Sequence, residues 1–386
     1  MPPRRFLRAE DVLSGADRSV LAHALRAAFV PLALLHRVGL EIYLLPYRTG
    51  IRKRTKLSVP VISIGNLTSG GTGKTPMATL VGRLLRESGM RAAILSRGHG
   101  GTHEREPGAK IVSRGDGALL LSPEIAGDEP ALLARLLPDV PVIVGRDRRI
   151  SGKLAIQTFA PDVLLLDDGL QFWQLHRDLD IILLDARRPF DNGWMLPRGL
   201  LREPPSHLRR AKIVVLTRAD QVSREALERE KTRIRSLAPR AQVFSANHAP
   251  TGWIDREGKE HSSPKEHSSP TEEIVAFSGI ADGAGFAAAL KRDGIDVKSH
   301  SSFRDHFTYN KKDIQRLLRE SPAAVYVTTE KDLGKIAALW PDPGPKLLAR
   351  RIVVRIEDED TFAQTLKRIL HCTNEEDHAI DAAGGR

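Results

Sequence analysis

The sequence contains a single cysteine, Cys372, among its 386 residues. One cysteine cannot form an intrachain disulfide or a cysteine-based zinc cluster, and it suits a reducing compartment. Aromatic residues are also scarce, at 5% of the chain, and no RNA-recognition, zinc-finger or helix-turn-helix signature is present. Both absences argue against a nucleic-acid partner. The first twenty residues contain no uninterrupted apolar run after their basic residues, so we expect no secretory signal.

The remaining composition is that of a soluble globular protein, with 41% apolar and 28% charged residues. A chain of this length can bury a substantial core and is expected to divide into two domains. Its net charge of +11 indicates a polyanionic partner or an anionic surface. Without a nucleic-acid signature, a membrane surface or a phosphorylated substrate fits this charge at least as well.

The most apolar segment, residues 21–45, precedes a basic stretch. Arg26, Arg37 and Glu41 would lie within about 60° of one another on a helical wheel, which predicts an amphipathic helix. Charges within the segment argue against an ordinary spanning helix. An apolar helix followed by basic residues favours an interfacial anchor on anionic lipid, and the alternative is a helix packed on the protein's own core. The basic residues are Arg48, Arg52, Lys53, Arg54 and Lys56.

From residue 58 onward, short apolar runs alternate with helix-length segments. Runs without strict alternation of polar residues predict strands that are covered on both faces, hence a mostly parallel sheet in an α/β/α core. The runs occupy residues 59–64, 90–98, 140–145, 161–169, 179–186, 211–220, 273–280, 324–332 and 351–356. We therefore predict an N-terminal helical segment (1–57), a first α/β domain (58–240), a linker (241–272), a smaller second α/β domain (273–372) and a flexible tail (373–386).

Within the linker, residues 259–270 repeat the unit KEHSSP twice. The repeat is polar and contains proline, so it cannot form a core and is expected to be a flexible surface insertion. The alternative is that its two histidines, His261 and His267, bind a metal ion.

The stretch SIGNLTSGGTGKTP (63–76) is similar to a phosphate-binding loop, although Thr68 stands where the common pattern has glycine. A predicted strand precedes it and a helix follows, so backbone N–H groups can bind phosphate oxygens. Gly65 and Asn66 are expected to form the turn at the end of the strand. Lys74 is expected to bind the β- and γ-phosphates and Thr75 to bind magnesium. The predicted nucleotide-binding residues are Thr68, Ser69, Gly70, Gly71, Thr72, Gly73, Lys74 and Thr75.

Further charged residues stand at predicted ends of strands or in loops. Asp167 and Asp168 follow four apolar residues and are expected to bind magnesium directly or through water. Arg148 is suited to binding a phosphate. Other candidates are Asp128 and Glu129 in GDEP, Arg202 and Glu203 in LREP, and the Asp305–His306 pair. A helix cap could explain the acidic pair of GDEP, and a lone Asp–His pair is usually structural, whereas the segment that carries Arg202 and Glu203 is too long and too apolar for a simple turn.

In their order along the chain, seven segments resemble those of the tetraacyldisaccharide 4'-kinase family. They are GNLTSGGTGKTP (65–76), LSRGHG (95–100), GDEP (127–130), DDGLQ (167–171), RPFDNG…LPRGLLREP (188–204), DHFTY (305–309) and TTEKD (328–332). The resemblance implies transfer of the ATP γ-phosphate, with Mg2+, to the 4'-hydroxyl of an acylated glucosamine disaccharide 1-phosphate, which forms lipid IVA in lipid A biosynthesis. It further implies a monomer that associates peripherally with the cytoplasmic face of a Gram-negative inner membrane.

The resemblance also implies roles for individual residues. Asp128 would be the catalytic base and His306 its partner, in a dyad assembled by closure of two domains. Asp167 and Asp168 would line the metal and phosphate region, with Glu203 as a further candidate for the metal. Thr75 would be a metal ligand. Substrate or phosphate contacts would come from Glu129, Arg148, Gln171 and Arg202.

Three positions depart from the family pattern: His99 replaces a tyrosine, and Phe172 and Phe307 each replace a histidine. An alternative is a membrane-associated P-loop ATPase switch of the partitioning type. That class requires a lysine where this chain has Ser69.

Overall fold

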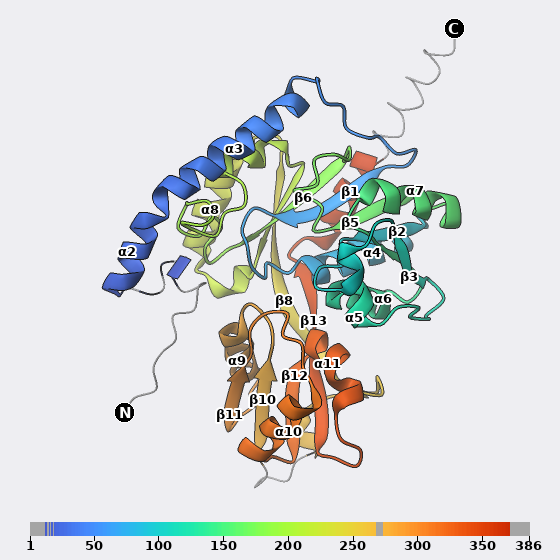
Figure 1. Cartoon of the computed structure of the whole chain (residues 1–386), viewed down its shortest axis with the longest axis vertical. Coiled ribbons are helices and arrows are strands. Elements are labelled where there is room, and N and C mark those ends of the chain that lie inside the picture. The colour runs from blue at the N-terminus through green and yellow to red at the C-terminus, as the bar shows by residue number, and fades with distance from the viewer. Residues whose placement is uncertain (1–11, 14, 16, 18, 268–272, 371–386) are drawn as a thin grey trace. The chain divides into compact units, whose positions relative to one another are not determined.

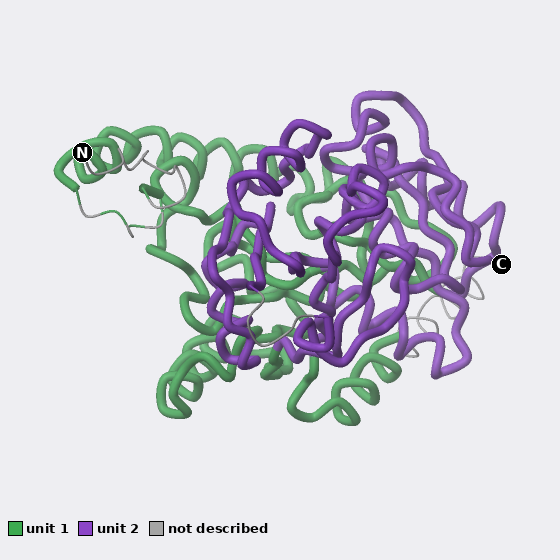
Figure 2. Tube along the Cα trace, turned by 90° about the horizontal axis from the view of Figure 1, so that it is seen from below, with its two compact units in different colours: residues 1–74, 163–247, 355–386 green, residues 75–162, 248–354 purple. Residues whose placement is uncertain are grey.

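The computed structural model describes residues 12, 13, 15, 17, 19–267 and 273–370. The chain forms two compact units, each assembled from separate segments (Figure 2). Unit 1 comprises residues 1–74, 163–247 and 355–386, and unit 2 comprises residues 75–162 and 248–354. The domain boundaries proposed from the sequence stay predictions. The predicted tail and Cys372 lie outside the described residues.

Unit 1 is built on a parallel sheet in the order β5-β1-β6-β7-β8 (Figure 1). The strands are β1 (Val61–Asn66), β5 (Val163–Asp167), β6 (Leu179–Asp185), β7 (Ile213–Thr217) and the first residues of β8 (Gln242–Asp255). Every residue of β1, β5 and β7 is buried. Burial on both faces explains why these strands read as continuous apolar runs.

One face of this sheet packs against an apolar core that includes Leu184, Leu216 and Ile234. Ile234 belongs to α8 (Arg224–Leu237), whose first turn is capped by the Ser223 side chain. The unit also contains the 3-10 turns η2 (Pro205–Arg210) and η3 (Ala219–Gln221), and a helix at residues 359–370. Phe362 of that last helix packs edge-on against Phe244 of β8, which ties the end of the chain to the sheet.

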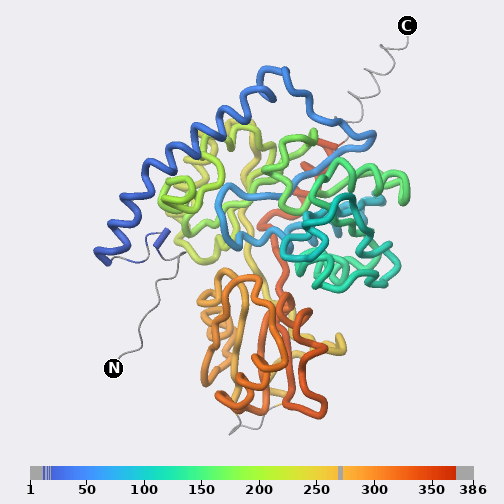
Figure 3. The backbone as a smooth tube through the Cα atoms, in the orientation of Figure 1, coloured from blue at the N-terminus to red at the C-terminus, as the bar shows by residue number. Residues whose placement is uncertain are grey.

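The predicted N-terminal helix is present as α2 (Val20–Ala28) and α3 (Val30–Arg48), the long blue segment in Figure 3. Together they span Val20–Arg48, which is long and apolar enough to cross a membrane by length and composition, and only 11% of the apolar window is buried. Part of α3 nevertheless packs on unit 1, because Leu44 and Tyr47 form a cluster with Trp173.

The first segment of unit 2 carries three paired strands, with β2 parallel and β3 antiparallel to β4. They are β2 (Ala92–Ser96), β3 (Lys110–Arg114) and β4 (Pro141–Val144). The helices here are α4 (Lys74–Glu87), η1 (Thr102–Arg105), α5 (Pro123–Ala126), α6 (Asp128–Leu136) and α7 (Arg148–Phe159). Strand β3 (KIVSR) has only two apolar residues, Ile111 and Val112, and lies outside the predicted runs.

The second segment of unit 2 contains a parallel sheet in the order β11-β10-β12-β13. Its strands are β10 (Ile274–Ser278), β11 (Ser299–Ser302), β12 (Val325–Thr329) and β13 (Lys346–Ile356). Its helices are α9 (Gly283–Arg292), α10 (Lys311–Glu320), α11 (Glu330–Ile336) and η5 (Ala337–Leu339). The core on one side of the sheet contains Phe277, Tyr326 and Trp340.

The KEHSSP repeat differs from its prediction as a flexible insertion. Its first copy lies in a hairpin in which β9 (Glu260–His261) pairs antiparallel with β8. The 3-10 turn η4 (Pro264–His267) follows, with Pro264 buried. The polar composition was misleading because the His261 side chain hydrogen-bonds to the buried carboxylate of Asp255, 2.8 Å away. Residues 268–272 lie outside the described part of the chain.

The α/β fold with mostly parallel strands, a P-loop core and an N-terminal helix is thus confirmed. Each unit then positions its own cluster of charged side chains at the ends of its strands and helices.

Candidate active site

The predicted phosphate loop joins β1 to α4, as the sequence indicates, and α4 begins at Lys74 with Thr75 next. Gly70 and Gly73 adopt φ values of +122° and +88°, which side-chain-bearing residues rarely take. The expected turn at Gly65 and Asn66 is wrong, because both residues still belong to β1. Gly65 is required there instead because Leu170 packs against the position that a side chain would occupy.

The structure explains why residue 68 is threonine, where the common loop pattern has glycine. Its backbone pairs with Leu201 in an antiparallel bridge, and the Ser69 N–H donates to the Leu200 carbonyl over 2.6 Å. The Arg202 N–H donates to the Leu67 carbonyl over 2.7 Å. The long segment 188–204 therefore lines the phosphate loop, and residue 68 is extended backbone that needs no glycine.

Several predicted residues of unit 1 meet beside this loop. The Lys74 ammonium lies 3.8 Å from Asp168 and 3.4 Å from the Asn66 side-chain oxygen. Arg202 donates to both carboxylate oxygens of Asp168, over 3.0 and 3.2 Å, and to the Asn66 carbonyl. Asp167 is buried at the end of β5. The two cations hold Asp168 next to the loop.

Glu203 is fully buried and surrounded by hydrogen-bond donors. Its oxygens accept hydrogen bonds from Arg210, over 2.7 and 3.0 Å, from Gln171 over 3.0 Å, and from His207 over 2.8 Å. Burial alone would raise the pKa of Glu203, but these donors and the charge of Arg210 lower it to about 2. Because its oxygens already serve this cationic network, Glu203 is placed to position Gln171, which also donates to the Asn66 carbonyl.

The sequence missed Arg218, which also contacts the phosphate loop. Its guanidinium donates to the Gly71 carbonyl over 2.7 Å and pairs with Asp185 at the end of β6. Only the position of Arg218 just after the apolar run of β7 could have singled it out.

In unit 2, Asp128 is the first residue of α6 and lies beside two partners from distant parts of the sequence. Its Oδ2 atom is 2.9 Å from the Lys335 ammonium and 3.4 Å from Nδ1 of His306. Burial alone would raise the pKa of Asp128, but the hydrogen bond with His306 and the positive charges of Lys335 and Lys331 hold it below its usual value. Asp128 is therefore a carboxylate near neutral pH.

A second lysine of α11 defines the protonation of His306. The Lys331 ammonium lies 3.2 Å from Nε2 of His306 and 3.7 Å from Glu129. An ammonium can only donate, so Nε2 accepts, and in the neutral ring the proton is on Nδ1, the nitrogen 3.4 Å from Asp128. His306 has a positive φ of 55°, and the ring of His99 meets it edge-on at 5.3 Å.

A buried carboxylate of α11, that of Asp332, supports this cluster beside Lys335. Asp332 accepts hydrogen bonds from the Gly279 N–H over 2.9 Å and from the Tyr309 hydroxyl over 3.2 Å, and lies 3.8 Å from Lys335. Burial and the charge of Asp332 raise the pKa of Tyr309, which keeps its hydroxyl protonated. The sequence placed TTEKD at the end of the predicted strand run 324–332, whereas α11 begins at Glu330, and nothing there assigned Lys331 or Lys335 to Asp128.

The structure thus brings the predicted residues into two clusters, one in each unit. Arg148 stands apart as the first residue of α7, where its buried side chain donates to the Arg146 carbonyl over 2.9 Å.

A model of one protein family, tetraacyldisaccharide-1-P 4'-kinase, matches residues 25–371. The chain belongs to this family. Among curated tetraacyldisaccharide 4'-kinases, that of Pelobacter propionicus is 38% identical over 92% of this chain and 96% of its own length. That of Anaeromyxobacter dehalogenans is 42% identical over 81% of both chains. The resemblance stated from the sequence is confirmed.

A solved member of the tetraacyldisaccharide 4'-kinase family has the same fold. The LpxK protein of Aquifex aeolicus, crystallised in complex with ATP, is 33% identical and superimposes with a TM-score of 0.71. The match covers 90% of this chain and 99% of that protein.

Proposed function

We propose that this chain is an ATP-dependent kinase that transfers the γ-phosphate to the 4'-hydroxyl of a tetraacyldisaccharide 1-phosphate, forming lipid IVA in lipid A biosynthesis. The observation that carries the proposal is the Asp128–His306–Lys335 cluster in a family member that also has a phosphate loop. A nucleotide-dependent switch would need the loop but would not need a carboxylate base outside it.

The phosphate loop binds ATP in this proposal. Loop N–H groups and the start of α4 bind phosphate oxygens, and Lys74 neutralises the β- and γ-phosphates. The oxygen donors of Thr75, Asp167 and Asp168 are the ligands that Mg2+ prefers, and the ion would reduce the charge of the phosphates. Arg202, now paired with Asp168, is available to bind a phosphate instead, since guanidinium groups bind carboxylates and phosphates alike.

Asp128 acts as the general base. The 4'-hydroxyl oxygen forms a bond to the γ-phosphorus while the bond to the β–γ bridging oxygen breaks, and the electron pair leaves with ADP. The hydroxyl proton passes to Asp128. His306 and Lys335 orient the carboxylate and keep it ionised, and Glu129 and Arg148 are proposed to contact the substrate.

The N-terminal helices are proposed to attach a monomer peripherally to the cytoplasmic face of the inner membrane. Leu35 and Ile42 are 67% and 65% exposed on α3. The same helix contacts the rest of unit 1, because the Glu41 carboxylate lies 3.1 Å from His207 Nε2 and His36 lies 2.9 Å from the Leu196 carbonyl. A helix that contacts its own protein through residues 36–47 favours lying in the interface over spanning the bilayer.

The test is phosphate transfer from labelled ATP to a tetraacyldisaccharide 1-phosphate in detergent micelles. We expect a lipid product with one additional phosphate at the 4' position. ATP hydrolysis without a phosphorylated lipid would reject the proposal and favour the switch.

A further inference from the structure

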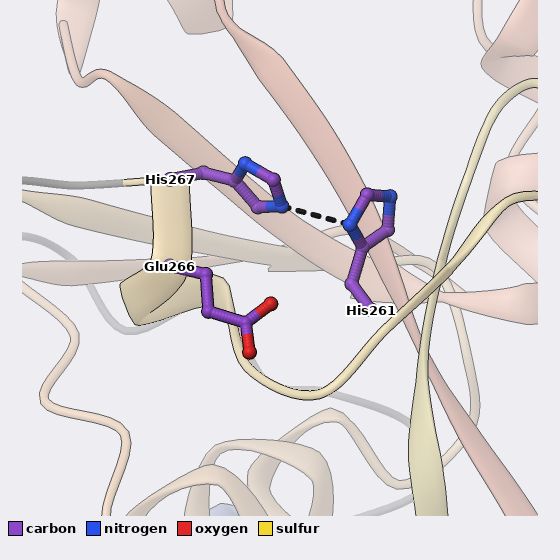
Figure 4. A group of neighbouring side chains, drawn as sticks. All are labelled: His261, Glu266 and His267. Atoms are coloured by element: carbon purple, nitrogen blue, oxygen red, sulfur yellow. Dashed lines mark hydrogen bonds between the residues drawn. The ribbon is translucent and has the colours of Figure 1, made fainter.

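The duplicated KEHSSP segment places three metal-ligand side chains together in unit 2 (Figure 4). His261, Glu266 and His267 each offer one ligand atom, and these atoms lie within 4.8 Å of one another. The two histidines occupy the same position in successive copies of the repeat. The duplication therefore supplied the second imidazole, and the hairpin between β8 and β9 together with η4 brings it back onto the first.

His261 is oriented by a buried partner behind it. Its Nε2 atom lies 2.8 Å from Oδ2 of Asp255, and the two side chains are only 6% and 4% exposed. Asp255 is itself held by Lys346, 2.8 Å away, and by the Lys259 N–H. A carboxylate that accepts from one ring nitrogen leaves the other nitrogen of a neutral imidazole unprotonated and fixes the ring orientation, as at many protein zinc sites.

The other ring nitrogen of His261 lies against the second histidine. Its Nδ1 atom lies 2.8 Å from Nε2 of His267, and the ring planes are inclined by 81°. In tetrahedral zinc sites two ligating nitrogens are about 3.3 Å apart, since each Zn–N bond is about 2.0–2.1 Å. A cation would fit between the rings if the distance from Nδ1 of His261 to Nε2 of His267 increased by about half an ångström. The proton of His267 would then be on its Nδ1 atom.

Glu266 supplies the negative charge of the group. Its carboxylate lies on the same side as the two rings and is exposed to solvent. Two imidazoles and a carboxylate are the ligand set that suits zinc and neighbouring late divalent metals rather than Mg2+. From this geometry we propose that His261, Glu266 and His267 form a binding site for Zn2+, separate from the nucleotide loop, which fastens the repeat to the β8–β9 hairpin.

The test uses the full-length protein after treatment with a chelator. Zn2+ is titrated in competition with a chromophoric chelator, in the presence of excess Mg2+ to saturate hard oxygen sites. We expect one Zn2+ per chain, and Co2+ in its place should give the visible absorption bands of a tetrahedral complex. Absence of such a site would overturn the proposal.

Matched variants locate the site. His267→Gln and Glu266→Gln should weaken Zn2+ binding by about tenfold to 100-fold or more, because even the loss of a supporting partner has effects of that size. Glu260→Gln changes the equivalent glutamate of the first copy, which pairs with Arg351, and should leave binding unchanged. Cys372→Ser should also leave it unchanged. Equal affinity in His267→Gln and the unchanged protein would reject this site.

Thermal unfolding provides a second readout that does not depend on kinase activity. Without zinc, His267→Gln and the unchanged protein should unfold at similar temperatures, since glutamine at this half-buried position can still hydrogen-bond to Nδ1 of His261. Zinc should raise the unfolding temperature of the unchanged protein and of Glu260→Gln, but not that of His267→Gln. A zinc-induced rise in all three would place the bound metal elsewhere.

Discussion

At the residue scale, the clearest prediction concerns the carboxylate of Asp128. Asp128→Asn keeps the shape of the side chain but removes the proposed base. We expect turnover to fall by about 10²–10⁴-fold with ATP affinity little changed, because a general base acts on the chemical step. Asp116→Asn, in an exposed loop where Asp116 caps the Ala118 N–H, is the matched control. Near-normal turnover in Asp128→Asn would show that another group accepts the proton.

Lys335 determines how acidic Asp128 is. Its ammonium lies 2.9 Å from the carboxylate and its side chain is only 8% exposed. Lys335→Met removes a charge that favours the ionised form, so the pKa of Asp128 should rise. The acidic limb of the pH profile of kcat/KM should therefore move to higher pH.

The control for this charge is Lys291→Met, at an exposed position of α9. Its pH profile should match that of the unchanged protein. If the acidic limb does not move in Lys335→Met, a group other than Asp128 causes it.

Glu203 predicts a pH dependence of stability. Its pKa is about 2 in the folded protein and 4.5 without the fold, so the ionised form stabilises the protein fully above pH 4.5. This stabilisation is lost as the pH falls from 4.5 to about 2. A shift of this size corresponds to about 3 kcal/mol of unfolding free energy.

Glu203→Gln should therefore unfold more easily at neutral pH and lose part of the decline in stability between those pH values. Denaturant unfolding across a pH series measures both effects. Glu320→Gln, at an exposed position of α10, is the control and should retain the full decline. The same decline in both variants would assign the acid sensitivity to other groups.

At the scale of the element, α3 has two faces with different roles. Leu44 and Tyr47 pack against Trp173, whereas Leu35 and Ile42 are exposed. The double substitution Leu35→Ser and Ile42→Ser should weaken sedimentation with anionic vesicles by about tenfold or more, because less apolar area is buried in the lipid.

The control pair for the helix consists of Leu120→Ser and Ile150→Ser, which are 49% and 46% exposed outside the N-terminal helices. It should leave vesicle binding unchanged. Equal loss in both pairs would mean that binding follows general surface hydrophobicity, and no loss in either would reject the helix as the anchor.

The basic stretch after α3 is only partly available to lipid. Arg48 pairs with Glu41, Arg52 lies 5.1 Å from the ring centre of Tyr47, and Arg54 lies 5.0 Å from that of Trp173. The sequence showed these cations as a uniform patch, because side-chain stacking on aromatic rings has no signature in a run of basic residues. Lys53 and Lys56 are exposed and remain candidates for lipid contact.

At the scale of the whole molecule, the net charge of +11 should make membrane binding depend on salt. Each basic residue near an anionic surface contributes about 1 kcal/mol, and salt screens this attraction. Binding to anionic vesicles should fall as ionic strength rises, and binding to neutral vesicles should be weak throughout. Salt-independent binding would assign the attachment to apolar insertion alone.

The sequence predicted most of the buried strands, since continuous runs such as β1, β5 and β7 are recognisable without knowing their neighbours. It failed on β3 and β11, whose polar residues form strands only because a neighbouring strand accepts their backbone hydrogen bonds. It failed in the same way on the KEHSSP repeat, where Asp255 gives His261 a buried partner.

By itself, the sequence determined the strand–loop–helix that can bind a nucleotide and the order of motifs that identifies the family. Such local features depend on residues that are close in the chain. The resemblance already paired His306 with Asp128. Only the tertiary structure decided that Lys335 lies beside Asp128, that segment 188–204 pairs with the phosphate loop at Thr68, and that two repeated histidines meet. The first two contacts join residues far apart in the sequence, and the two histidines meet only because the β8–β9 hairpin and η4 fold the repeat back on itself, so all three depend on the folded chain.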